Sequence, residues 1–267
     1  MKEEDETMKR IFSGDRFLKW FTIGVYVFIF APILVVILMS FHPMDIVSFP
    51  MPGFSLKWYL RFFSNYRLLD SLRISILLGI ASALVSGIVG TMAAFGLVRG
   101  QFKGKELLNA LIFAPMVLSG VVMGVALLAF YQFAHLPRGF WGLVIAHTLF
   151  TLPYVVIVVA ARLAGFNRFL EEAAMNLGAN RLQTLRKVTL PIIAPGIIGG
   201  MMLAFTISFD EFPATQFLAT PHTNTIPIRV FSMIKTELSP QINVLATIMI
   251  IITVGLPVIA HYILRKK

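Results

Sequence analysis

The sequence predicts an all-α protein that crosses a membrane several times. Of its 267 residues, 57% are hydrophobic and only 13% are charged, and the mean hydropathy is +0.82. Soluble chains carry about 25% charged residues, so a soluble domain is excluded. A helix needs roughly 20 apolar residues to cross the hydrocarbon core, and six runs qualify. Strands of a membrane barrel would instead alternate over about ten residues.

The six apolar runs define the expected spans in chain order. They cover residues 20–41, 74–98, 107–133, 140–161, 192–209 and 244–263, and the fifth is the shortest. Residues 1–19 are expected to form a tail, with the polar residues 1–16 loose or lying on the membrane surface, and residues 264–267 form a second tail. The first run is too long for the core of a signal peptide, and no small-x-small cleavage site follows it. We therefore expect a retained anchor.

The net charge of +10 is explained by membrane topology. Most of the 23 lysines and arginines fall in the segments that this topology places in the cytoplasm. The seven that fall outside are Lys57, Arg61, Arg67, Arg73, Arg138, Arg229 and Lys235. A cytoplasmic excess of basic residues sets the orientation of membrane proteins. It predicts that both termini are cytoplasmic, and it gives no reason to expect a nucleic-acid partner.

Several other classes of protein are disfavoured by what the sequence lacks. There is no cysteine, which excludes disulfides and thiolate metal sites. The five histidines show no paired spacing, so a metal-dependent intramembrane enzyme is not indicated. No Asp, Glu, Lys or Arg lies inside the six runs, which argues against an ion-coupled secondary transporter. The turn 99–106 lacks the glycine spacing and the Ser or Thr of a phosphate-binding loop, so no ATP site is encoded there.

Small and polar residues within the runs predict contacts between helices. Small residues recur at steps of four over 82–90 in the second run, and Gly120 and Gly124 repeat that step in the third. Such rows let helix backbones approach closely in lipid. His147 lies in the fourth run without a carboxylate partner. An intramembrane histidine is a functional candidate by default, but here a structural hydrogen-bonding role is favoured.

The most informative stretch lies between the fourth and fifth runs. Leu170, Ala173, Ala174 and Leu177 fall at i, i+3, i+4 and i+7, which predicts a short amphipathic helix. Gly178 is suited to the left-handed conformation that ends a helix. The two alanines have side chains small enough to let a partner come close. The sequence therefore predicts a docking element between two membrane spans.

The residues around this helix support the same interpretation. Glu171 and Glu172 fall in its first turn, where negative charge suits the positive end of the helix dipole. Pro191 follows Leu190 and is well placed to begin the next helix. A second proline, Pro195, predicts a kinked entrance to the fifth span.

These residues carry a resemblance to a known family. Glu172-Ala173-Ala174, three residues, Gly178, nine residues and then Val188-x-Leu190-Pro191 resembles the Glu-Ala-Ala loop of ATP-binding-cassette importer permeases. The only departure is Val188, where that family usually has Ile. The resemblance implies that the loop 166–191 forms a coupling helix that docks into a groove of a cytoplasmic ATPase.

The resemblance also implies the partners. It implies a second permease subunit, two cytoplasmic ATPase subunits and an extracytoplasmic substrate-binding protein, in a bacterial cytoplasmic membrane. ATP and Mg would be used by the ATPase, and this chain would bind no cofactor and have no enzymatic activity of its own.

Four further segments resemble the permeases of spermidine/putrescine importers, and among these the smaller, C-type subunit. They are residues 53–59, 208–211, 226–235 and 239–247. The resemblance favours a polyamine substrate, with ferric iron, opine or aminophosphonate as the alternatives within the same family.

Four residues are candidates for the substrate pathway. Asp210 and Glu211 are expected to reach the outer membrane face, either as simply solvated acids or as groups that attract a cation into a vestibule. Tyr154 and Phe209 are candidate ring faces for that cation.

Overall fold

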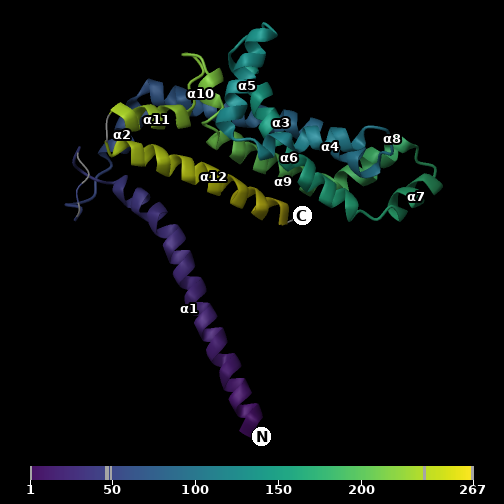
Figure 1. Ribbon diagram of the computed structural model, residues 1–267, viewed down its shortest axis with the longest axis horizontal. Helices are drawn as coiled ribbons and strands as arrows, with labels where there is room; N and C mark the ends of the chain where they lie inside the picture. Colours follow the sequence, from purple (N-terminus) through teal and green to yellow (C-terminus); the bar gives the residue numbers. More distant parts are fainter. Residues whose placement is uncertain (1, 46–47, 49, 237–238, 266–267) are drawn as a thin grey trace. The chain divides into compact units, whose positions relative to one another are not determined.

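The computed structural model describes residues 2–45, 48, 50–236 and 239–265, and every regular element there is a helix (Figure 1). The chain divides into two compact units. The first holds Met1–Ser64 with Thr236–Ile248, and the second holds Asn65–Lys235 with Met249–Lys267.

Five helical segments within the described residues are long and apolar enough to cross a membrane. They are Phe17–Met39 in α1 (Lys2–Met39), α3 (Tyr66–Arg99), α6 (Phe140–Ala164), the combined segment Arg181–Asp210, and Gln241–Val258 in α12 (Gln241–Arg265). A bent pair, α4 (Lys105–Val117) and α5 (Gly120–Phe133), makes a sixth when it is counted as one span. The predicted fold class, an all-α membrane protein with six spans, is confirmed.

The N-terminal segment differs from the expectation of a loose tail, because α1 is helical from Lys2 onward. At the other end, α12 reaches Arg265, and Lys266 and Lys267 of the predicted C-terminal tail lie outside the described residues.

The prediction of one continuous third span over 107–133 is wrong. The chain bends by 117° between α4 and α5. Leu118 and Ser119 adopt extended backbone conformations at the bend, with ψ angles of 140° and 138°. Pro115 lies just before it and removes a backbone donor from the last turn of α4. The apolar composition therefore predicted the extent of this segment, but it did not predict that the segment is divided into two helices.

Pro191 lies in the first turn of the α-helix that starts at Leu190, as predicted, but the fifth span begins earlier than expected because that helix continues a helical segment that starts at Arg181. Asn180 caps the preceding turn, α8 (Arg181–Thr184), in a reciprocal capping box with Gln183. The helix then passes through a π-helical turn, η1 (Leu185–Thr189), into α9 (Leu190–Asp210). In that turn the N–H of Leu190 donates to the carbonyl of Leu185. A proline ring displaces the carbonyl four residues before it, and the wider turn accommodates Pro191 without ending the helix.

Three helices of the second unit, α3, α6 and α9, pack side by side and hold its main core. The small residues of α3 lie in their interface, as predicted. A side chain at Gly90 would meet Val155 of α6 at 2.8 Å, and one at Gly87 would meet Met201 of α9 at 2.6 Å. The hydroxyl groups of Ser86 and Thr151 share a hydrogen bond of 2.6 Å across the same contact. These glycines permit the close approach of the helices.

A second buried cluster joins α5 to α6 and to the short helix α10 (Thr215–Leu218). Gly124 lies against this helix, because a side chain there would meet the Ala214 backbone and the Phe217 ring, each at 2.7 Å. Figure 1 places α10 towards one end of the second unit and α7 (Phe169–Asn176) at the other. The sequence did not predict α10 or α11 (Ile226–Thr236), which lie in a segment expected to be a loop.

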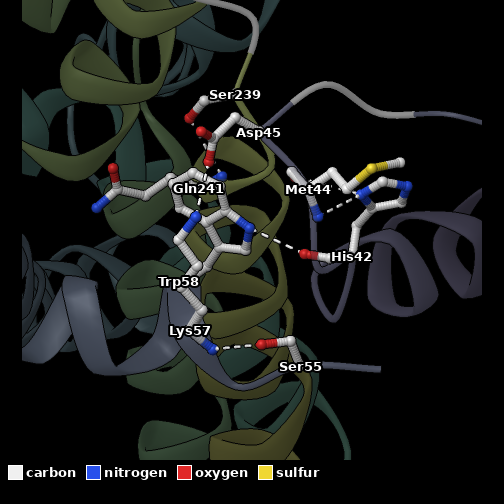
Figure 2. A network of polar contacts seen from close by, with 8 residues as sticks. All are labelled: His42, Met44, Asp45, Ser55, Lys57, Trp58, Ser239 and Gln241. Atoms are coloured by element: carbon white, nitrogen blue, oxygen red, sulfur yellow. Dashed lines mark hydrogen bonds and ion pairs between the residues drawn. The ribbon is translucent and has the colours of Figure 1, made fainter. Parts of the chain in front are cut away.

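The first unit contains α1, α2 (Lys57–Ser64) and the segment between them, and Figure 2 shows some of its polar contacts. The indole N–H of Trp58 donates to the His42 carbonyl at 2.9 Å, and Trp58 is 2% exposed. Trp58 is therefore a packing residue of this unit. A hydrogen bond from Lys57 lowers the pKa of the exposed Asp45 carboxyl below its usual value.

Candidate functional site

The predicted docking element is present as α7, a helix of eight residues between the fourth and fifth spans. Glu171 and Glu172 lie in its first turn, as the sequence indicated. Gly178 follows the helix with φ of 90°, the left-handed region that favours glycine. Its N–H donates to the Met175 carbonyl at 3.0 Å and that of Ala179 donates to Ala174 at 3.1 Å, which closes the helix end.

The apolar face of α7 is largely uncovered. Leu170 is 45% exposed and Leu177 is 89% exposed, and Ala173 between them is also exposed. Ala174 is half-buried and turns towards the rest of the unit. The predicted stripe therefore forms a small apolar surface in the second unit. α7 packs on α8 and η1.

The two glutamates of α7 differ in their surroundings. Glu172 is exposed, whereas the Glu171 side chain is only 16% exposed and accepts two hydrogen bonds from Nη1 of Arg99, at 2.9 and 3.1 Å. The hydroxyl of Thr189 also donates to Glu171. Glu171 thus connects α7 to the end of α3 and to η1.

Arg99 and Thr189 were missed as site residues from the sequence. Arg99 ends the second apolar run, where a basic residue is adequately explained by topology. Thr189 is one of many hydroxyl residues near span ends. Only the folded chain places both beside Glu171, 72 and 18 residues away along the sequence.

Leu190 and Pro191 directly follow Thr189 and form the start of α9. Leu190 packs against the main core, and Pro191 is exposed. Beside η1 lies an open cavity of about 410 Å³. Its lining includes Arg99, Glu171 and Thr189 together with Met175 of α7.

The candidate substrate acids lie at the opposite end of α9. Asp210 is exposed, and no hydrogen bond or ion pair joins its carboxylate to another residue in the described part of the chain. Glu211 is half-buried, and its Oε1 accepts from the Ala214 N–H at 2.7 Å. Glu211 therefore stabilises the turn that leads into α10, whereas the Asp210 carboxylate remains available.

The two candidate aromatic residues differ in their burial. Phe209 is 1% exposed, belongs to the main core and stacks on Phe205 with ring centroids 5.7 Å apart. It presents no free ring face in this conformation. Tyr154 in α6 is half-buried.

His147 is a structural residue, as the sequence favoured. It is 1% exposed, and its two ring nitrogens contact the hydroxyls of Ser208 at 2.8 Å and Thr215 at 2.9 Å. These contacts join α6 to α9 and α10. Among the described residues, no group of three or more His, Asp or Glu side chains is arranged to hold a metal ion.

Comparison with known proteins agrees with this arrangement. The family of binding-protein-dependent transport system inner membrane components matches residues 86–266. The chain belongs to this family, and it is therefore a multi-pass inner-membrane protein.

Individual relatives and structures can also be compared. The chain is 36% identical to the spermidine/putrescine transport system permease protein PotC of Haemophilus influenzae, over 97% of this chain and 99% of that protein. It is 35% identical to the putrescine transport system permease protein PotI of Escherichia coli K12, over 84% and 82%. Among solved structures, a bacterial ABC transporter involved in alginate import has a chain with TM-score 0.75 and 16% identity, covering 98% of both chains. That similarity shows the fold.

Proposed function

We propose that this chain is a permease subunit of an ATP-driven importer and forms half of a pathway for a polyamine such as spermidine or putrescine. The observation that carries the proposal is α7, a helix with an uncovered apolar face between the fourth and fifth spans. The polyamine substrate is supported by the 36% identity to a spermidine/putrescine permease over nearly the full length of both chains.

The energy for transport comes from partner subunits in this proposal. Two cytoplasmic ATPases bind ATP and Mg, and a second permease subunit completes the pathway. A binding protein delivers the substrate from outside, in keeping with the family of binding-protein-dependent systems. The chain itself holds neither ATP nor another cofactor.

α7 is the surface on which an ATPase docks. Leu170, Ala173 and Leu177 enter an apolar groove of that partner, and Glu172 lies beside them as an exposed charge. This places α7 and both termini in the cytoplasm, the orientation that the excess of basic residues favours.

The continuous helix from Arg181 to Asp210 transmits the motion of α7. Its 30 residues extend over roughly 45 Å at 1.5 Å per residue. ATP-driven closure of the ATPases moves α7, and the helix carries this displacement towards Asp210. The two states of the pathway must bind the substrate with different affinity for this to produce net transport.

At its outer end, Asp210 attracts the cationic substrate. A carboxylate beside a low-dielectric wall raises the local concentration of cations. Glu211 supports the loop that holds it, and Tyr154 and Phe209 are pathway residues only in a conformation that opens their surroundings.

The proposal is tested by reconstituting the chain with its companion permease and ATPase in vesicles, with the binding protein outside. We expect ATP-dependent uptake of radiolabelled spermidine or putrescine that excess unlabelled polyamine suppresses. Ferric iron, an opine and an aminophosphonate serve as competing substrates. If one of these were taken up with ATP and polyamines were not, the substrate assignment would change to that solute. Transport by the chain alone would overturn the proposal.

A further inference from the structure

The carboxylate of Glu171 is the point where three segments of the second unit meet. It belongs to α7, it accepts hydrogen bonds of 2.9 and 3.1 Å from Arg99 at the end of α3, and it accepts a third from Thr189 in η1. Each contact is an oriented hydrogen bond to a charged acceptor, which is stronger and more directional than a neutral one.

The guanidinium of Arg99 is itself held in place by aromatic rings. It lies 5.1 Å from the ring centroid of Phe95 and 5.5 Å from that of Phe166. Its Nε and Nη2 atoms are buried and make no hydrogen bond within the described residues. Cation–π contacts with these rings compensate in part for that loss. Arg99 is therefore oriented with Nη1 towards Glu171, and a lysine would not reproduce this planar arrangement.

Thr189 owes its position to the π-helical turn. It is fully buried and is the last residue of η1, directly before Leu190 and Pro191. A π-helical turn inserts one extra residue and so rotates the side chains that follow it, and such turns are frequent at functional sites. The turn that accommodates Pro191 thus also directs a hydroxyl at Glu171.

Packing alone does not fix α7 against α3. α7 packs on α8 and η1, and the connection to α3 is made by the Arg99 side chain. The open cavity of about 410 Å³ lies beside the same three polar residues. Because the contact of Glu171 with Arg99 and Thr189 borders this cavity, few other atoms pack against it. The contact therefore depends on its hydrogen bonds.

We propose that Arg99 and Thr189 are positioning residues, which hold the docking helix through Glu171 so that its displacement reaches α3 and α9 together. The inference rests on the proposed function, since it assigns how the force received by α7 is divided between two spans. Without Arg99, a displacement of α7 would reach α3 only indirectly, through the packing of α9 on α3.

The test compares Arg99→Gln with Lys103→Gln in the complete transporter. Both changes remove one positive charge from the same cytoplasmic segment, but Lys103 is exposed and Arg99 holds Glu171. We expect Arg99→Gln to lower the substrate molecules transported per ATP by about tenfold, since breaking a partly buried charge pair has large effects. We expect Lys103→Gln to transport as wild type does. The ratio of transport to ATP hydrolysis is the decisive measurement, because a merely structural defect reduces both rates together.

Three further variants keep the outcome interpretable. The double variant Arg99→Glu with Glu171→Arg restores the pair in reverse and is expected to recover several-fold over either single change. Thr189→Val keeps the shape of the side chain and removes its hydroxyl, and we expect a several-fold lower ratio, with Thr189→Ser near wild type. If Arg99→Gln prevents assembly, the comparison of Thr189→Val with Thr189→Ser decides.

Wild-type transport ratios in Arg99→Gln and Thr189→Val would overturn this inference while leaving the proposed function intact. Failure of the wild-type complex to import any polyamine would instead overturn the proposed function. The two results are distinguished by the wild-type measurement.

Discussion

The two ends of the second unit each carry a pair of adjacent acids, and the pairs can be compared residue by residue. At the α7 end, Glu171 is partly buried and bonded to Arg99, whereas Glu172 is exposed. At the far end of α9, Glu211 is half-buried and accepts from the Ala214 N–H, whereas Asp210 is exposed.

The comparison separates two roles that look alike in the sequence. In each pair the more buried acid makes structural contacts, with the Arg99 and Thr189 side chains at Glu171 and with the Ala214 N–H at Glu211, and the exposed acid remains available for a partner or a substrate. The order is reversed between the two ends, because the buried acid comes first at α7 and second after α9. Adjacent residues of a helix face different directions, so the surroundings decide which acid has which role.

The largest effect is expected from Gly178→Pro, which acts on the end of α7. Proline fixes φ near −65° and cannot adopt the observed φ of 90°, and it also removes the N–H that donates to Met175. The path of the chain after α7 must change, so we expect polyamine uptake to fall to background while the ATPase remains active. Vesicle uptake measured together with ATP hydrolysis checks this.

Gly178→Asn is the matched control, because asparagine tolerates the left-handed conformation better than other side chains. We expect it to retain most of the uptake. Normal transport by Gly178→Pro would contradict the role of α7 as the docking element.

A smaller effect is expected from Glu172→Lys, which tests the exposed acid of the first pair. The side chain is exposed within this chain, so the change should leave the melting temperature in detergent unaltered. At a docking surface, a reversed charge weakens the contact, and a loss of about 1.4 kcal/mol corresponds to about tenfold in affinity. We expect transport per ATP to fall, and co-purification of the ATPase measures the contact itself. Unchanged co-purification and uptake would remove Glu172 from the interface.

Much of this fold follows from the sequence because membrane spans obey simple rules of length and polarity. The apolar runs located the spans, and the periodicity of Leu170, Ala173 and Leu177 located α7. Gly178 was correctly expected in the left-handed conformation. These features depend on residues that lie close together in the chain.

The features that the sequence did not provide depend on contacts between distant segments or on backbone continuity. The bend between α4 and α5 divides a uniformly apolar run. Pro191 lies in the first turn of α9 as expected, but the span already begins at the capping box of Asn180 and reaches α9 through η1. The contact between Arg99 and Glu171 joins residues 72 apart, and Phe209 is buried by the packing of three helices. Local patterns contain no information about such neighbours.

The smallest effect is expected at the second pair, where Asp210→Asn is compared with Glu211→Gln. Asparagine removes the exposed charge and keeps the shape, so a cationic substrate should be attracted less, with KM raised by about threefold to fivefold. Raising the ionic strength should shrink this difference between wild type and variant, because salt screens exposed charges. Uptake of spermidine at several salt concentrations measures both quantities.

Glu211→Gln provides the contrast for this measurement. Its amide oxygen is still able to accept from the Ala214 N–H, so the turn into α10 should be kept and KM should change less than with Asp210→Asn. Removing the side chain altogether, with Glu211→Ala, should instead lower the free energy of unfolding by about 1 kcal/mol, the usual net contribution of one hydrogen bond. If Glu211→Gln raised KM as much as Asp210→Asn did, both acids would serve the substrate. The division into one structural and one available acid would then hold only at the α7 end.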